Sequence, residues 1–164
     1  MDKRFYLSPE CPGQLDDDTD YDALRGGKKD SVGISLQGWS GDPLLSVNPI
    51  YFCTTELANQ LHRRFGVESH SLRIGTDPEY DFFLEEYYRT KPTFRRLELS
   101  SFSARSHVGL LGPYLLVSED ALSFLLQFTV WADLEFAEVP LDRDWDPEEL
   151  ALKRPSPQKR FPTQ

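Results

Sequence analysis

The most regular pattern of apolar and polar positions along the chain is a short apolar run, then an amphipathic stretch, then a second short strand. It occurs twice. In the first copy, residues 50–53 form the apolar run, Thr54 or Thr55 caps the predicted helix, and Gly66 ends it. The apolar positions of this helix recur at helical spacing: Leu57, Ala58, Leu61 and Phe65. Residues 71–74 then alternate as a strand, so this copy is predicted to be a strand–helix–strand unit.

The second copy begins with the apolar run at 114–117, and Ser118 is placed to cap the helix that follows. This helix is apolar around most of its circumference, which predicts deep burial: Ala121, Leu122, Phe124, Leu125, Leu126 and Phe128. Leu134, Phe136 and Val139 indicate the closing strand. An alignment without gaps pairs Thr55 with Ser118 and gives five identities: Tyr51 with Tyr114, Glu56 with Glu119, Ala58 with Ala121, Phe65 with Phe128, and Val67 with Val130.

Outside the two units, strands are predicted at 3–7, 32–36 and 94–102. A third helix is predicted from Pro78, with one aromatic-rich face: Tyr80, Phe83, Leu84, Tyr87 and Tyr88. We therefore expect a single α+β domain over residues 1–150, with a mixed or antiparallel sheet and about three helices packed against it. The composition changes after Pro140, and residues 151–164 are predicted to be a disordered C-terminal tail.

Charge narrows the range of partners. The formal net charge is −9 and the pI is about 4.8, which disfavours nucleic acid and anionic membrane and favours a basic protein partner. No apolar stretch approaches the roughly 20 residues needed to span a bilayer. The N-terminal residues have no apolar core of a signal peptide, so we expect a cytoplasmic protein.

The residue patterns of common active sites are not found. Gly33-Ile34-Ser35-Leu36-Gln37 lacks the second glycine of a hydrolase elbow, and Gly109-Leu110-Leu111-Gly112 lacks the lysine of a phosphate-binding loop. Aspartates between 16 and 22 resemble the start of a calcium loop, but Tyr21 stands where glycine is required. We therefore predict no metal, no cofactor and no enzymatic activity. The alternative is an enzyme of unrecognised type, with a pocket around Arg105, His107 and a carboxylate.

The segment from Gly112 to Ala121, together with residues 134–139, resembles the C-terminal signature of the Imm11-like (DUF1629-type) immunity proteins of bacterial polymorphic toxin systems. In that family a strand leads into "SE", an amphipathic helix, and a strand of the type x-φ-E-F-x-x-V. The resemblance covers about a third of the chain. It departs from the pattern at residues 129–132, where the usual glycine between helix and strand is missing. It implies a cytoplasmic, non-enzymatic inhibitor that binds one cognate toxin.

We therefore predict an acidic immunity-type protein that binds and neutralises a cognate protein toxin. An adaptor or structural module of a toxin secretion system is a further alternative. The sequence does not determine the oligomeric state. The candidate partner-binding residues are an acidic loop, one tryptophan and an acidic helix face: Asp16, Asp17, Asp18, Asp20, Asp22, Trp39, Glu85 and Glu86.

Overall fold

The computed structural model describes residues 3–20 and 32–156. The strands are β1 (Arg4–Ser8), β2 (Gly13–Leu15), β3 (Gly33–Leu36), β4 (Leu44–Val47), β5 (Ile50–Thr54), β6 (Glu68–Ser71), β7 (Arg73–Thr76), β8 (Phe94–Glu98), β9 (Val108–Leu111), β10 (Tyr114–Ser118) and β11 (Glu135–Glu138). The α-helices are α2 (Thr55–Phe65), α3 (Glu85–Thr90) and α4 (Glu119–Phe128), and the 3-10 helices are η1 (Pro78–Leu84) and η2 (Pro147–Glu149).

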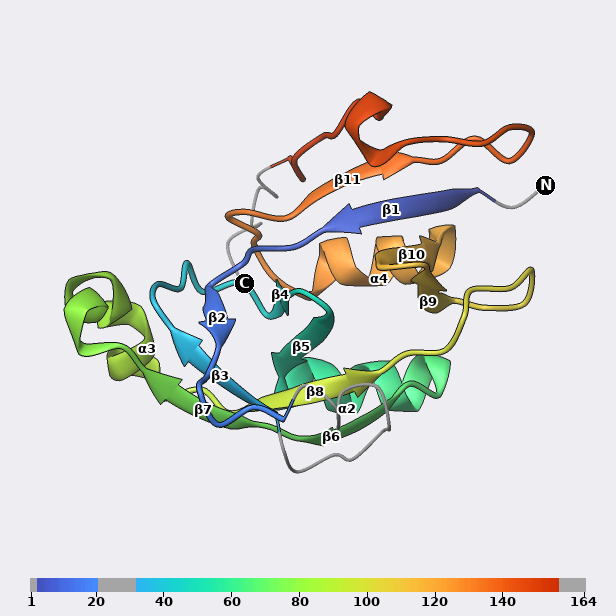
Figure 1. Cartoon of the computed structure of the whole chain (residues 1–164). Helices are drawn as coiled ribbons and strands as arrows, with labels where there is room; N and C mark the ends of the chain where they lie inside the picture. The colour runs from blue at the N-terminus through green and yellow to red at the C-terminus, as the bar shows by residue number, and fades with distance from the viewer. Residues whose placement is uncertain (1–2, 21–31, 157–164) are drawn as a thin grey trace, which may run out of the picture.

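The strands form three mostly antiparallel sheets, and the predicted α+β fold is confirmed. Two sheets have four strands, in the orders β11-β1-β10-β9 and β4-β5-β8-β6, and the third has the order β2-β3-β7. Figure 1 shows β1 and β11 at the top of the molecule, β6 and β8 at the bottom, and the lobe that holds α3 projecting at the left. Sequence reasoning expected one sheet, because local alternation identifies strands but does not show which strands pair.

The two strand–helix–strand units are confirmed, and each is preceded by a hairpin strand. The strand that closes the first unit is Glu68–Ser71, however, and not residues 71–74 as predicted. The first unit is β4-β5-α2-β6 and the second is β9-β10-α4-β11. The hairpins pair in the same register, since Val47 faces Ile50 and Leu111 faces Tyr114, and each residue of the second stands 64 positions after its counterpart. Both hairpin turns end in proline, at Pro49 and Pro113.

The helix caps correct the alignment of the two copies. Thr54, not Thr55, accepts the N–H of Leu57, just as Ser118 accepts the N–H of Ala121. A shift of 64 positions, and not the 63 implied by pairing the tyrosines, therefore superposes the units. With this shift the three buried positions of α2 match those of α4: Leu57, Ala58 and Leu61 with Ala121, Leu122 and Leu125.

Each four-stranded sheet is built from one unit together with one strand that stands next to the other unit in the sequence. β1 precedes the first unit in the chain but lies between β10 and β11, antiparallel to both. β8 precedes the second unit but lies between β5 and β6, again antiparallel to both. The registers match, because Arg4 faces Ser118 as Phe94 faces Thr54. The molecule thus consists of two similar halves that have exchanged a strand.

Two hydrophobic cores result from this arrangement. The larger one joins both halves, since it contains the buried residues of α2 and α4 together with Leu7 of β1 and Leu97 of β8. The smaller core lies between the sheet β4-β5-β8-β6 and the three-stranded sheet β2-β3-β7. It includes Ile34, Phe52 and Phe94. Both faces of the sheet β4-β5-β8-β6 are therefore covered.

The prediction of one α-helix that begins at Pro78 is wrong for the first part of this segment. Residues 78–84 form the 3-10 helix η1, begun by Asp77 and Pro78, and only residues 85–90 are α-helical. A 3-10 helix has three residues per turn, so the apolar positions of an α-helical pattern do not share one face. Leu84 is buried, but Phe83, which was assigned to the inner face, is 62% exposed.

The C-terminal segment is paired to β11 as far as Lys153. The backbone N–H and C=O of Lys153 exchange hydrogen bonds with Phe136, at 2.8 and 2.9 Å. The segment that was predicted to be a disordered tail from residue 151 thus begins with a residue pair in the second sheet, and residues 157–164 lie outside the described residues.

Because each half contains a strand of the other, we predict that neither half folds alone. Fragments 1–92 and 93–164 should each lack a cooperative thermal transition by circular dichroism, since each is missing the central strand of its sheet. An equimolar mixture should recover the transition and elute as one complex. A cooperative transition of fragment 1–92 by itself would show that β8 is dispensable for the first sheet.

Candidate functional site

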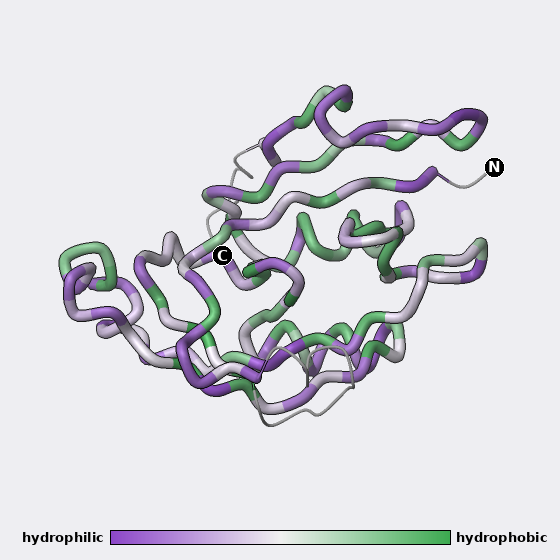
Figure 2. The backbone as a smooth tube through the Cα atoms, viewed as in Figure 1, coloured by the Kyte–Doolittle hydropathy of each residue, from purple (hydrophilic) through white to green (hydrophobic). Residues whose placement is uncertain are grey.

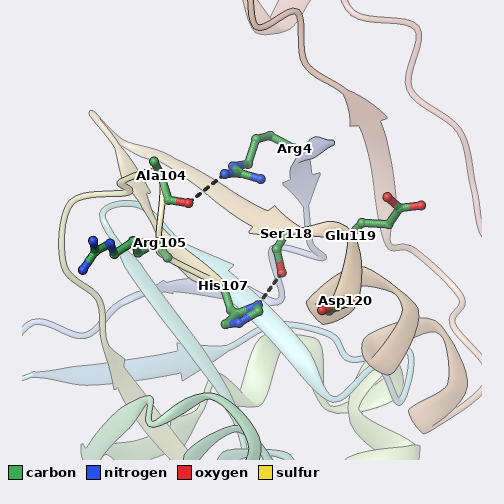
Figure 3. A pocket seen from close by; sticks show the side chains of 8 residues that line it. Arg4, Ala104, Arg105, His107, Ser118, Glu119 and Asp120 are labelled. Atoms are coloured by element: carbon green, nitrogen blue, oxygen red, sulfur yellow. Dashed lines mark hydrogen bonds between the residues drawn. The ribbon is translucent and has the colours of Figure 1, made fainter. Parts of the chain in front are cut away.

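A polar pocket lies at the N-terminal end of α4. It has a volume of about 380 Å³. Its lining comes from β1, from the loop before β9 and from the start of α4: Arg4, Ala104, Arg105, Ser106, His107, Ser118, Glu119 and Asp120. This is where the enzyme alternative placed its pocket, and the structure does bring Arg105 and His107 together with two carboxylates (Figure 3).

Two side chains of the pocket, His107 and Ser118, are joined by a hydrogen bond. Nδ1 of His107 and Oγ of Ser118 are 2.8 Å apart, and the backbone N–H of Ser118 donates to the carbonyl of His107. The His107 ring also packs at 5.0 Å from the ring of Phe65. Ser118 Oγ also accepts the N–H of Ala121 at 3.2 Å, so the same oxygen contacts both the His107 ring and the first turn of α4.

This geometry is that of a helix cap and not of an activated nucleophile. A serine nucleophile needs an accessible oxygen, whereas Ser118 is buried and its oxygen is engaged on two sides. Figure 3 shows the side chains of Arg105 and Glu119 pointing away from the His107–Ser118 pair, in opposite directions. Arg105 and Glu119 therefore do not converge with the His107–Ser118 pair on a point where a reacting atom would sit.

The repeat explains why a hollow is present at this place. A second pocket, of about 310 Å³, lies at the start of α2. Five of its lining residues are counterparts, 64 positions earlier, of residues in the first pocket: Gly41, Pro43, Thr54, Thr55 and Glu56. A hollow at this place thus follows from the fold in both halves, and the His107 position is occupied by proline in one of them. Among the described residues, no group of three or more His, Cys, Asp or Glu is placed to hold a metal ion.

The aspartates of the predicted acidic loop differ in their surroundings. Asp16 accepts two hydrogen bonds from the Arg73 guanidinium, at 3.0 and 3.1 Å, and one from the Thr19 hydroxyl. The bond with Arg73 holds the pKa of Asp16 below its ordinary value. Asp16 therefore serves mainly to fix β2 to β7. Asp17, Asp18 and Asp20 are exposed, and Asp22 lies outside the described residues.

Trp39 is half-buried and helps to hold the first half together. Its indole N–H donates to the carbonyl of Asp42 at 2.9 Å, and its ring meets the Phe94 ring edge-on at 5.6 Å. Its remaining surface lines a hollow of about 550 Å³, which Phe83 and Glu10 also line. Trp39 and Phe83, which comes two residues before Glu85, therefore lie on the same part of the surface.

The segment Pro78–Thr90, which we call the aromatic lobe, carries the most exposed aromatic rings among the described residues. Phe82 is 87% exposed, and its ring contacts that of Phe83 at 5.5 Å. Glu85 is exposed, whereas Glu86 is held by Arg89 through bonds of 2.6 and 3.2 Å. In Figure 2 the hydrophobic tip of this lobe stands out at the left.

Sequence reasoning missed Phe82 and Phe83 as surface residues, although one signal was present. Adjacent residues of an α-helix point about 100° apart, so two consecutive phenylalanines cannot both lie on a narrow inner stripe.

Sequence reasoning also missed two carboxylic acids at the junction of the halves, Asp42 and Glu10. Asp42 is buried and accepts the backbone N–H groups of residues 132–134, and Glu10 accepts both the N–H and the hydroxyl of Ser40.

No family model, no curated protein and no solved structure matches this chain. The likeness to Imm11-like immunity proteins therefore stays a prediction. Within the described part of the chain, no helix is long and apolar enough to cross a membrane.

If Ser118 is a structural cap, its removal should destabilise the protein. We expect Ser118→Ala to lower the free energy of unfolding by about 1–2 kcal/mol, and Thr54→Ala, the matched variant in the other half, by about 1 kcal/mol. Urea unfolding followed by fluorescence measures both. Stabilisation by Ser118→Ala would instead mark a strained functional residue, for which replacement often relieves strain.

Glu10 should make the stability depend on pH. Burial, with the charges of Asp133 and Asp42 nearby, raises the pKa of Glu10 from 4.5 to about 7. The folded state therefore holds a proton that the unfolded state has lost, so the stabilisation is complete below pH 4.5 and disappears as the pH rises through 7. We expect the Tm to fall between pH 5 and pH 8, and Glu10→Gln to reduce this fall. The exposed Glu138→Gln is the control, and it should leave the profile unchanged.

Proposed function

We propose that this chain is a non-enzymatic, immunity-type protein that binds a cognate toxin in the cytoplasm and neutralises it by covering it, with the aromatic lobe as the main contact. The exposure of Phe82 and Phe83 is the observation that carries this proposal. Burying a phenylalanine side chain is worth about 1.5–3 kcal/mol, so two rings held in water represent a considerable unsatisfied driving force. Exposed aromatic pairs of this kind are typical centres of protein interfaces.

The lobe presents its rings in an ordered setting. The 3-10 helix is fixed at its start by the Asp77 cap and at its end by buried Leu84. The Tyr88 hydroxyl donates to Asp81 at 2.7 Å, which ties α3 back to η1. A partner that binds here orders few side chains, and a preformed surface loses less entropy on association.

Charge supports a basic partner. The same lobe carries three exposed carboxylates: Glu79, Asp81 and Glu85. Together with the net charge of −9, they favour fast association with a positively charged surface. The neighbouring hollow beside Trp39 and Phe83 extends the surface that the partner can cover. The cognate toxin is therefore expected to offer a basic face with a pocket for two aromatic rings.

The double variant Phe82→Ser/Phe83→Ser tests this proposal. Co-expressed with the product of the adjacent gene, the wild-type chain should form a complex and protect the cell. The variant should bind about a hundredfold more weakly or worse and lose protection, because two central aromatic contacts are removed. Calorimetry measures the affinity, and an unchanged Tm would confirm that the fold is intact.

The matched control is Val130→Ser/Leu152→Ser, which removes two exposed aliphatic side chains outside the lobe. This control should bind like the wild type. Equal binding by the lobe variant would remove the lobe from the interface. No complex and no protection with any neighbouring gene product would contradict the immunity function itself, and would favour the enzyme or the secretion-system adaptor.

The enzyme of unrecognised type is favoured by one observation, the polar pocket at Arg105 and His107. His107→Ala would abolish such an activity, whereas toxin binding through the aromatic lobe should be unaffected.

A further inference from the structure

The hollow of about 550 Å³ beside Trp39, which we call the Trp39 hollow, combines aromatic walls with one carboxyl group. Its lining comes from three parts of the chain: residues 10–13 after β1, residues 37–39 after β3, and Phe83 of η1. None of the described residues that line it is Lys, Arg or His, and Glu10 is the one carboxylic acid among them. A group that enters the hollow therefore meets two aromatic rings and an acid.

The walls of this hollow are held in place by contacts within the chain. The carbonyl of Pro12 accepts the backbone N–H groups of Gln37 and Gly38, at 2.8 and 3.1 Å. Gly38 in turn lies against Phe83, because a Cβ added at Gly38 would stand 3.8 Å from the Cβ of Phe83. The indole N–H of Trp39 donates a hydrogen bond to a backbone carbonyl. A side chain that binds here therefore orders little of the protein, so less entropy is lost on association.

Glu10 has room for one more hydrogen bond. Its Oε1 accepts the N–H and the hydroxyl of Ser40, at 3.2 and 2.9 Å, and its Oε2 accepts the same N–H at 3.0 Å. A carboxylate offers about four acceptor positions, so Oε2 keeps one that Ser40 does not use. None of the ion pairs among the described residues involves Glu10. The acid that lines the hollow is thus oriented by Ser40 and has no cationic partner in the described part of the chain.

The charges that act most strongly on Glu10 are negative. Burial raises the pKa of Glu10 to about 7, and the charges of Asp133 and Asp42 add to this effect. A basic side chain, Arg154, lies near Asp133, since its guanidinium donates to the carbonyl of Ala132 at 3.5 Å, but it does not line the hollow. A cation that enters the hollow therefore reduces the repulsion among these acids and favours the ionised form of Glu10.

We propose that the Trp39 hollow binds an arginine side chain of the toxin, whose guanidinium donates to Oε2 of Glu10 and lies against the rings of Trp39 and Phe83. Arginine fits better than lysine, because a planar guanidinium stacks on aromatic rings and is more weakly hydrated than an ammonium group. The arginine belongs to the basic face of the toxin, so this site rests on the proposed function. Phe83 joins the aromatic lobe to the hollow in one continuous interface.

The site is tested first with small probes that do not require the toxin. N-acetylarginine amide should shift the nuclear magnetic resonance signals of the Ser40 amide and the Trp39 indole in a saturable way, because the first bonds Glu10 and the second forms a wall. N-acetylcitrulline amide has a similar shape without the charge, and should bind about tenfold more weakly or worse. Glu10→Gln should weaken the binding of the arginine probe to the same extent, and a Tm at pH 8 no lower than that of the wild type checks its fold.

Two further measurements locate the probe in the hollow. Since Glu10, with its pKa of about 7, must be ionised to bind, the affinity for the arginine probe should rise about tenfold from pH 6 to pH 8. Glu10→Gln should remove this rise. Alkylation of Cys11, which is exposed and lines the hollow, should abolish binding, whereas Cys53 is buried and stays unmodified. Cys11→Ser, treated with the same reagent, should bind as it does untreated.

Three results with the probes would overturn the site. One is that the arginine probe causes no saturable shift. Another is equal binding of the arginine and citrulline probes, because the charge would then not be recognised. The third is unchanged affinity of Glu10→Gln for the arginine probe. Phe82→Ser, which removes a ring of the lobe that does not line the hollow, should keep full affinity for this probe.

The toxin itself separates this site from the proposed function. Glu10→Gln should weaken the complex about tenfold at pH 8, and the exposed Glu138→Gln should leave it unchanged. Toxin binding that Phe82→Ser/Phe83→Ser loses and Glu10→Gln keeps would overturn the arginine site and leave the proposed function standing. Arginine binding in the hollow without any toxin complex would support the site and contradict the proposed function.

Discussion

The pairing of β1 with β10 on one side and β11 on the other is the constraint on which the rest of the structure depends. β10 and β11 run parallel, so they need a strand between them to be joined in one antiparallel sheet, and only β1 provides it. β8 does the same for β5 and β6. Since Leu7 and Leu97 of these strands both enter the larger core, the exchange also makes that core common to both halves.

Local features of the sequence were sufficient to predict the repeated unit. Thr54 or Thr55, Ser118 and the apolar stripes all act within a few residues, and the caps and helices were found at those places. The exchange of strands was not predictable in this way, because Leu7 pairs with Leu115 and Phe136, more than a hundred positions away. Periodicity carries no signal for such pairing. The same limit applies to the third sheet, where Ile34 meets Ile74.

The candidate surfaces show a similar division. Acidic residues could be named from the sequence, but their roles depend on neighbours that are remote in the chain. Asp16 meets Arg73, and Asp42 meets residues 132–134, so these carboxylates stabilise the fold. Among the exposed large hydrophobic side chains, Phe82, Phe83 and Tyr88 lie together on the aromatic lobe. The lobe lies where the two halves differ, because η1 and α3 follow the first unit, whereas the described residues after the second contain only the three-residue helix η2.

The exchange of strands also has a consequence for synthesis on the ribosome. β1 is made before all of its partner strands, and its partners in β11 are made more than 120 residues later. At about 5–20 residues per second, the N-terminal strand waits on the order of ten seconds before its sheet can close. Throughout this time its apolar side chains, Phe5 and Leu7, lack their native partners. The sheet β11-β1-β10-β9 therefore cannot close until β11 has been made, and a product that is truncated before β11 lacks one of its four strands.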